Sequence, residues 1–298
     1  MDSLIDRWKG RWLLAALLCG VFSWAMGADD APPADVHLEE KPFDALSVRD
    51  AHPLGLKALA LAPAKWKHAE TPHFILHYRR ATEAQKAARE VEFTLWFVAR
   101  SLGAAPERYA KKSHVYVFQD EHEWSQFRPE AEVPGWSASF ASDDDLFLHI
   151  GGPGEAFDSR ILAHETTHAV VARLYPRQTW PLWLNEGFAE TMAGTSIAAR
   201  KHVWTKGMQQ ELSMATLSPE ELTAISVYPK EEWEVTRFYQ SSEKLVRFLL
   251  NTCPKERFPR FIDAVLGGRP FREAFLQVYG DQVKDYSAFL KQYERFTK

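Results

Sequence analysis

The segment H-E-T-T-H at residues 164–168 constrains this chain more than any other part of its sequence. Residues four apart lie on the same face of an α-helix, so His164 and His168 can each direct a ring nitrogen at one ion. Glu165 lies about 100° further around the same helix, where its carboxylate can reach a water molecule on that ion without binding the ion itself. The segment therefore predicts a helix that carries two ligands of a zinc site.

A second segment supplies a third ligand. Residues 183–190 have the sequence W-L-N-E-G-F-A-E, an apolar helical turn in which 17 residues separate Glu186 from His168. Two histidines, one glutamate and an open position for water form the ligand set of a catalytic zinc, whereas structural zinc sites fill all four positions with protein ligands. We therefore predict that His164, His168 and Glu186 bind Zn²⁺ as the cofactor of this protein.

Together the two segments resemble the zinc-binding segments of the gluzincin metallopeptidases. The similarity is to bacterial peptidase MA-like domains and, more distantly, to the aminopeptidase N and thermolysin families, and it extends weakly from about residue 73 to residue 293. It implies that His164, His168 and Glu186 are the metal ligands and that Glu165 is the general base. The spacing before Glu186 is one residue shorter than in the aminopeptidases, and no G-x-M-E-N anchor for a substrate amino terminus precedes His164. Both departures favour an endopeptidase or another amide hydrolase over an aminopeptidase.

The same resemblance implies roles for two further side chains. In gluzincins an acidic group four residues after the ligand, here Glu190, commonly accepts the spare N–H of a ligating histidine. Tyr239 begins a helix similar to the one after the third ligand in peptidase MA-like domains, and related gluzincins have an oxyanion-stabilising tyrosine in that region. Tyr228 is the alternative for this role. A solvated glutamate and packed aromatic side chains are the explanations that involve no catalysis.

The first 27 residues have the features of an export signal. Three basic residues, Arg7, Lys9 and Arg11, precede an apolar run over residues 12–26, and small residues before position 28 predict cleavage after Gly27. An uncleaved anchor is the alternative, although the run is short for a membrane span. We expect an exported protein, periplasmic or secreted, without stable membrane association after cleavage.

Cleavage leaves Cys253 as the one remaining cysteine, so no disulfide can form within the chain. The signal carries three basic and two acidic residues, so its removal shifts the net charge from −4 to −5. A mildly acidic chain gives no reason to expect nucleic acid as a partner.

The pattern after the signal predicts an α+β fold. Residues 28–66 are polar and aperiodic, which indicates an N-terminal extension or linker before a metallopeptidase domain at 67–298. Strands are expected at 73–78, 114–118, 137–140 and 146–150, with helices at 81–102 and 121–127 and almost throughout the chain after Asp158. The resemblance implies a zincin-like plan, with an N-terminal mixed sheet lobe, a zinc helix and a mostly helical C-terminal lobe. We expect the zinc helix to begin after Asp158 and to bury Ile161 and Leu162.

The expected substrate is an extended peptide or protein. Residues 146–150 precede the zinc helix as the edge strand does in gluzincins, where the substrate backbone pairs with that strand. Two other functions stay open at this stage. One is a non-catalytic peptide-binding or assembly protein on the same fold, although such a protein needs no general base at Glu165. The other is a zinc amidase that acts on cell-wall peptides.

Overall fold

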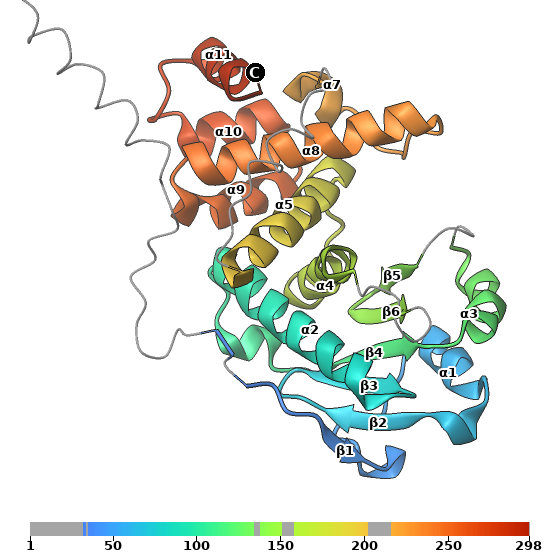
Figure 1. The fold of residues 1–298 in the computed structure, drawn as a ribbon. Helices are drawn as coiled ribbons and strands as arrows, with labels where there is room; N and C mark the ends of the chain where they lie inside the picture. The colour runs from blue at the N-terminus through green and yellow to red at the C-terminus, as the bar shows by residue number, and fades with distance from the viewer. Residues whose placement is uncertain (1–31, 34, 134–137, 151–157, 202–215, 298) are drawn as a thin grey trace, which may run out of the picture. The chain divides into compact units, whose positions relative to one another are not determined.

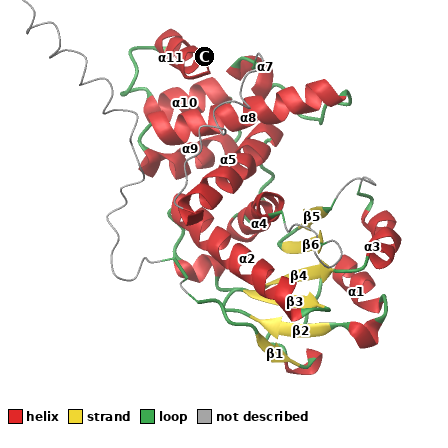
Figure 2. Ribbon diagram, viewed as in Figure 1, coloured by secondary structure: helices red, strands yellow, loops and turns green. Residues whose placement is uncertain are grey.

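A six-stranded mixed sheet, with helices on both faces, forms the N-terminal half of the described chain (Figures 1 and 2). The computed structural model describes residues 32–297 except 34, 134–137, 151–157 and 202–215, and these residues belong to one compact unit that begins at Pro32. The predicted signal peptide, residues 1–27, lies outside the described residues. Among the described helices, none combines the length and apolar character that a membrane span requires.

The sheet has the strand order β1-β2-β3-β4-β6-β5. Its central pairs, β3 with β4 and β4 with β6, are parallel, and the remaining pairs are antiparallel. The strands are β1 (Glu39–Lys41), β2 (Lys67–Glu70), β3 (Phe74–Tyr78), β4 (Ser113–Phe118), β5 (Ser139–Ser142) and β6 (Asp145–His149). Every residue of β3 and β4 is buried, as expected for parallel strands covered on both faces.

Most of the chain after β6 is helical, which confirms the predicted α+β class. The helices are α1 (Pro53–Ala60), α2 (Ala81–Ser101), α3 (Glu121–Phe127), α4 (Ser159–Leu174), α5 (Leu182–Lys201), α7 (Pro219–Thr223), α8 (Glu232–Thr252), α9 (Phe258–Leu266), α10 (Phe271–Tyr279) and α11 (Tyr286–Thr297). Short 3₁₀ turns lie at Phe43–Ala45, Pro63–Lys65, Pro106–Tyr109, Arg128–Ala131 and Lys255–Arg257. Helices α2 and α4 cover one face of the sheet, and α1 and α3 cover the other.

Residues 32–66 differ from the predicted extension or linker. They contribute the edge strand β1 and the helix α1, and the Trp66 side chain is buried against Phe118 with ring centroids 5.5 Å apart. Helix α1 packs so closely on β4 that a Cβ on Gly55 would lie 2.0 Å from the Tyr116 hydroxyl oxygen. Leu54, Ala58 and Leu61 recur at helical spacing, so the sequence does carry a signal for α1, and the prediction of an aperiodic linker overlooked it.

The predicted edge strand is also wrong. Strand β6, which holds most of residues 146–150, lies inside the sheet between β4 and β5, and β5 is the edge strand on this side. A tight turn at Asp143, with φ of 51°, folds β5 and β6 into a hairpin. The sequence pattern predicts both strands but cannot show which of them pairs with β4.

Candidate metal centre

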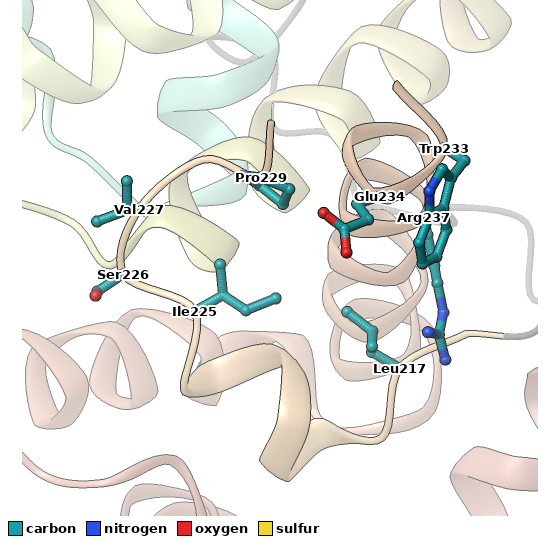
Figure 3. A pocket seen from close by; sticks show the side chains of 8 residues that line it. All are labelled: Leu217, Ile225, Ser226, Val227, Pro229, Trp233, Glu234 and Arg237. Carbon is teal, nitrogen blue, oxygen red and sulfur yellow. The ribbon is translucent and has the colours of Figure 1, made fainter. Parts of the chain in front are cut away.

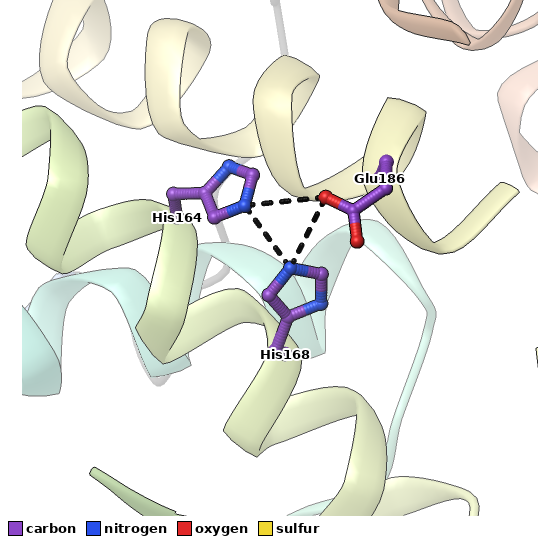
Figure 4. Close-up of side chains that lie close together, drawn as sticks. All are labelled: His164, His168 and Glu186. Carbon is purple, nitrogen blue, oxygen red and sulfur yellow. Dashed lines mark hydrogen bonds and ion pairs between the residues drawn. The ribbon is translucent and has the colours of Figure 1, made fainter. Parts of the chain in front are cut away.

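Helix α4 carries the two histidines. Asp158 caps its N-terminus by accepting hydrogen bonds from the backbone amides of Arg160 (2.9 Å) and Ile161 (3.1 Å), as the sequence predicts. Leu162 is buried as expected, but Ile161 is 41% exposed and does not enter the core. The two histidines project from α4 toward α5 (Figure 4).

Helix α5 packs on α4 and brings the third residue into place. Glu186 is 3% exposed, and it follows the buried Trp183 and Leu184, which hold the first turn of the helix against the core. The next residue, Gly187, faces α8, where a Cβ would lie 2.3 Å from the backbone oxygen of Ser242. A glycine beside the ligand therefore permits the close approach of α5 and α8.

Three possible ligand atoms converge between α4 and α5 (Figure 4). The Nε2 atoms of His164 and His168 lie 3.0 Å apart, and Glu186 Oε2 lies 3.4 Å from the first and 3.6 Å from the second. Among the described residues, Glu186 Oε2 is a buried oxygen with no hydrogen-bond donor. This is an arrangement that could hold a metal ion, and it joins the three residues that the sequence predicts.

Residues of α5 contact the other ring nitrogen of each histidine. Glu190 Oε1 lies 3.2 Å from His164 Nδ1, and Asn185 Oδ1 lies 3.3 Å from His168 Nδ1. Arg160 in turn donates to Glu190 Oε2 at 2.7 Å. An oxygen next to Nδ1 favours the tautomer with its proton on that nitrogen, which leaves Nε2 free to bind a metal.

From the sequence, a structural role for Asn185 is as well supported as a functional one. Its place beside Glu186 in the W-L-N-E-G-F-A segment is the one signal that could have drawn attention to it. Glu190 Oε1 lies 3.2 Å from His164 Nδ1, and its role as the acceptor of that ring N–H stays a prediction.

Without a metal, the two histidines are paired with carboxylates. Burial lowers the pKa of His164, but the carboxylates of Glu186 and Glu190 outweigh this effect and raise the pKa to about 10. Burial acts in the opposite direction on Glu186, yet the two histidines hold the pKa of this carboxyl well below its usual range. The Glu186 carboxylate is therefore ionised beside a positively charged His164. The proton on His164 supplies the positive charge that a bound metal ion would supply in its place.

Glu165 contacts the edge strand β5. Its Oε2 accepts a hydrogen bond of 3.1 Å from the backbone amide of Ala141, which lies in β5. This bond holds the carboxylate between α4 and β5, the edge strand among the described residues. The predicted general base and the edge strand therefore meet at one place.

Tyr228 contacts the site directly, and Tyr239 stacks on Tyr228. The Tyr228 hydroxyl donates to Glu186 Oε1 at 2.5 Å, and the rings of Tyr228 and Tyr239 stack with centroids 6.4 Å apart. Burial, with the nearby charge of Glu186, raises the pKa of both tyrosines, so both remain protonated donors at neutral pH. The structure thus places Tyr228, the alternative in the sequence analysis, directly on the ligand carboxylate, with Tyr239 next to it.

Comparison with known proteins adds no further information about this site. No protein-family model matches the sequence, and a comparison with curated proteins finds no significant match.

Proposed function

We propose that this protein is an exported, zinc-dependent metallopeptidase of the gluzincin type, with an endopeptidase activity on extended peptides. The observation that carries the proposal is the convergence of His164 Nε2, His168 Nε2 and Glu186 Oε2 on one point, with a carboxylate from Glu165 on the same helix. An export signal at residues 1–27 would deliver the protein to the periplasm or the exterior.

The donor set fits zinc. Two nitrogen or oxygen ligands about 2.1 Å from a tetrahedral zinc lie about 3.4 Å from each other. The three separations here are 3.0, 3.4 and 3.6 Å, so small side-chain movements would accommodate the ion. The buried Glu186 Oε2, which lacks a donor among the described residues, would gain a partner. When bound, zinc would supply Lewis acidity, which acidifies water and polarises a carbonyl group.

The residues of the chain divide the remaining chemistry. Glu165, held through Oε2 by the Ala141 amide, would take a proton from the attacking water and return it to the leaving amine. Tyr228 would orient Glu186 through their 2.5 Å hydrogen bond. Tyr239 would donate a hydrogen bond to the oxyanion, since its raised pKa keeps its proton in place. Asn185 and Glu190 would fix the two imidazole rings.

The fold around the site supports a zincin-like interpretation and an extended substrate. A mixed sheet precedes α4, and mostly helical structure follows it. Strand β5 leaves one backbone edge beside Glu165, and an extended peptide could add to this edge as a further strand. Pairing with β5 would bring several substrate residues past the base, which suits internal cleavage better than removal of one terminal residue.

Substitution of the base tests the proposal. The Glu165→Gln variant should retain zinc. Its kcat for blocked peptides should fall by at least about 10²-fold, because an amide cannot accept the proton. Glu273→Gln, an exposed glutamate on α10, is the matched control and should keep full activity. Equal rates for wild type and Glu165→Gln would refute the mechanism.

Substrate comparison separates this proposal from its rivals. Peptides with a blocked amino terminus should be cleaved internally at least as well as free peptides, and aminoacyl chromogenic substrates should barely react. Stepwise shortening of unblocked peptides alone would indicate an aminopeptidase. Release of cell-wall peptides without cleavage of ordinary peptides would indicate the amidase, and binding without any cleavage would indicate a binding protein.

A further inference from the structure

An open pocket of about 380 Å³ lies between the start of α8 and the loop that precedes it (Figure 3). Its lining includes Ile225, Pro229 and Trp233, but none of the three candidate ligands and neither Tyr228 nor Tyr239. A separate group of charged side chains does contact the metal centre. It lies beside the outer ring nitrogen of His164, near the start of α4.

Each carboxylate oxygen of Glu190 has its own partner in this group. Oε1 lies 3.2 Å from His164 Nδ1, and Oε2 accepts a hydrogen bond of 2.7 Å from Arg160 Nη2. Arg160 and His164 are four residues apart on α4, so both side chains leave the same face of the helix and reach the carboxylate together. Two contacts fix the plane of a carboxylate, whereas one contact lets it rotate about its last side-chain torsion.

Helix stability does not explain an arginine at this position. Arg160 is the second residue of α4 after the N-cap residue Asp158. The peptide dipoles make a cation unfavourable at this end of a helix. The Arg160 side chain is 45% exposed, so it does not serve to fill the core. Its ion pair with Glu190 offsets the unfavourable position and links α4 to α5.

A second carboxylate adds to the need for a cation here. Glu243 of α8 is 13% exposed. Burial raises the pKa of its carboxyl, Arg247 lowers it, the charge of Glu190 raises it, and Arg160 lowers it. Arg160 thus attracts two carboxylates, one from α5 and one from α8, and offsets the repulsion between them that would disfavour a fixed Glu190.

We propose that Arg160 is a positioning residue of the metal centre, which acts through Glu190 on the ring of His164. Arg160 holds the carboxylate beside Nδ1, where it can accept the ring proton, and this keeps Nε2 directed at the ion. The inference rests on the proposed function for the identity of the ion, and its own content is the coupling of Arg160 to Glu190. Because a partly exposed ion pair contributes little free energy, we expect an effect of about 3–5-fold on zinc affinity.

Zinc affinity, measured by competition with a chelator, tests this coupling. Arg160→Met should weaken zinc binding by about 3–5-fold, and Arg160→Lys, which keeps the charge, should stay within about 2-fold of wild type. When Arg160→Met is combined with Glu190→Gln, it should add nothing to the loss caused by Glu190→Gln, because Arg160 acts through that carboxylate. Arg89→Met, which changes an exposed arginine on α2, is the matched control and should bind zinc as wild type does.

Unchanged zinc affinity in Arg160→Met would overturn the inference. So would a loss that adds fully to that of Glu190→Gln, or an equal loss in Arg160→Lys and Arg160→Met. If the losses are coupled but zinc-loaded wild type cleaves no peptide, the inference stands and the proposed peptidase activity fails. If wild type cleaves blocked peptides but the two losses add, the activity stands and the inference fails. A wild-type protein that binds no zinc would overturn both.

Discussion

Two clusters of histidines in this protein have ring nitrogens about 3 Å apart, and only one of them has the character of a metal site. In the metal centre, His164 and His168 come from one helix and are 15% and 16% exposed. The other cluster is a chain across the sheet, in which His68 Nδ1 lies 2.8 Å from His77 Nδ1 and His77 Nε2 lies 2.9 Å from His114 Nδ1. His77 is fully buried there, and its ring stacks on Tyr116.

The partners of the rings make the difference. In the metal centre both Nε2 atoms face the same carboxylate oxygen, and Glu190 and Asn185 occupy the outer nitrogens. In the sheet, His77 uses one nitrogen for each neighbour, so no single nitrogen of this ring faces both. Among the described residues, the metal centre is the one group of three whose possible ligand atoms all lie within 4.8 Å of one another. Close histidines alone are thus weak evidence for a metal site. Stronger evidence is the convergence of their Nε2 atoms on one point, with an oxygen atom next to each Nδ1.

The largest expected contrast between the clusters is in zinc binding. His164→Ala should reduce the zinc content after dialysis from about one ion per chain to nearly none, because only two ligands remain. His77→Gln should leave the zinc content unchanged and lower the melting temperature, since it changes a buried contact. Metal analysis and thermal unfolding of both variants measure this contrast. Near-unit zinc in His164→Ala would remove the basis of the comparison.

The second contrast is in acid stability, measured on metal-free protein. Burial lowers the pKa of His114 from its ordinary 6.5 to about 4, so the unfolded chain binds this proton more readily than the folded chain. The stability that the neutral ring contributes is therefore present above pH 6.5 and is lost as the pH falls toward 4. It corresponds to at most about 3 kcal/mol, from about 1.36 kcal/mol per pKa unit.

The contribution of His114 to the pH dependence of stability is measured by comparing wild type with a variant that lacks this imidazole. Urea unfolding from pH 7 to pH 4 should show that wild type loses stability relative to His114→Gln, whereas exposed His122→Gln should follow wild type. The difference is needed because burial also raises the pKa of Asp145 to about 7, which stabilises the folded protein as the pH falls. Parallel curves for wild type and His114→Gln would show that the buried chain does not titrate in this way.

A third comparison, within the metal centre, separates the two tyrosines. Tyr239→Phe should lower kcat by about 10²-fold with little change in KM, if its hydroxyl acts on the transition state alone. Tyr228→Phe removes the donor to Glu186, so it should weaken zinc binding as well as turnover. Steady-state kinetics and zinc titration of both variants decide between the roles. A normal kcat in Tyr239→Phe, with a large loss in zinc-saturated Tyr228→Phe, would transfer the oxyanion role to Tyr228.

The smallest expected effect concerns the oxygens behind the rings. Glu190→Gln and Asn185→Ala should each weaken zinc binding by about 10–100-fold, because the imidazole loses its fixed orientation. Competition with a chelator of known affinity gives these values. Asn251→Ala, exposed on α8, should bind zinc as wild type does. Unchanged zinc affinity in both variants would mean that the outer contacts do not distinguish the metal centre from the buried chain.

The sequence by itself determines the parts of this protein that depend on local spacing. His164 and His168 share a helical face because they are four residues apart, and the same offset places Glu190 beside the ligand Glu186. The strand and helix patterns likewise predict the α+β class, and Asp158 marks the start of α4. Each of these features follows from the periodicity of one helix or strand or from a cap.

Tertiary structure alone decides which segments meet. Strand β5 rather than β6 is the edge because β6 pairs with β4, and β1 joins the sheet through its pairing with β2. Tyr228 reaches Glu186 across 42 positions of the chain, and Asn185 reaches His168 across 17. Long-range contacts of this kind depend on how whole elements pack, so the sequence supplies the candidate metal ligands and the fold supplies what holds and surrounds them.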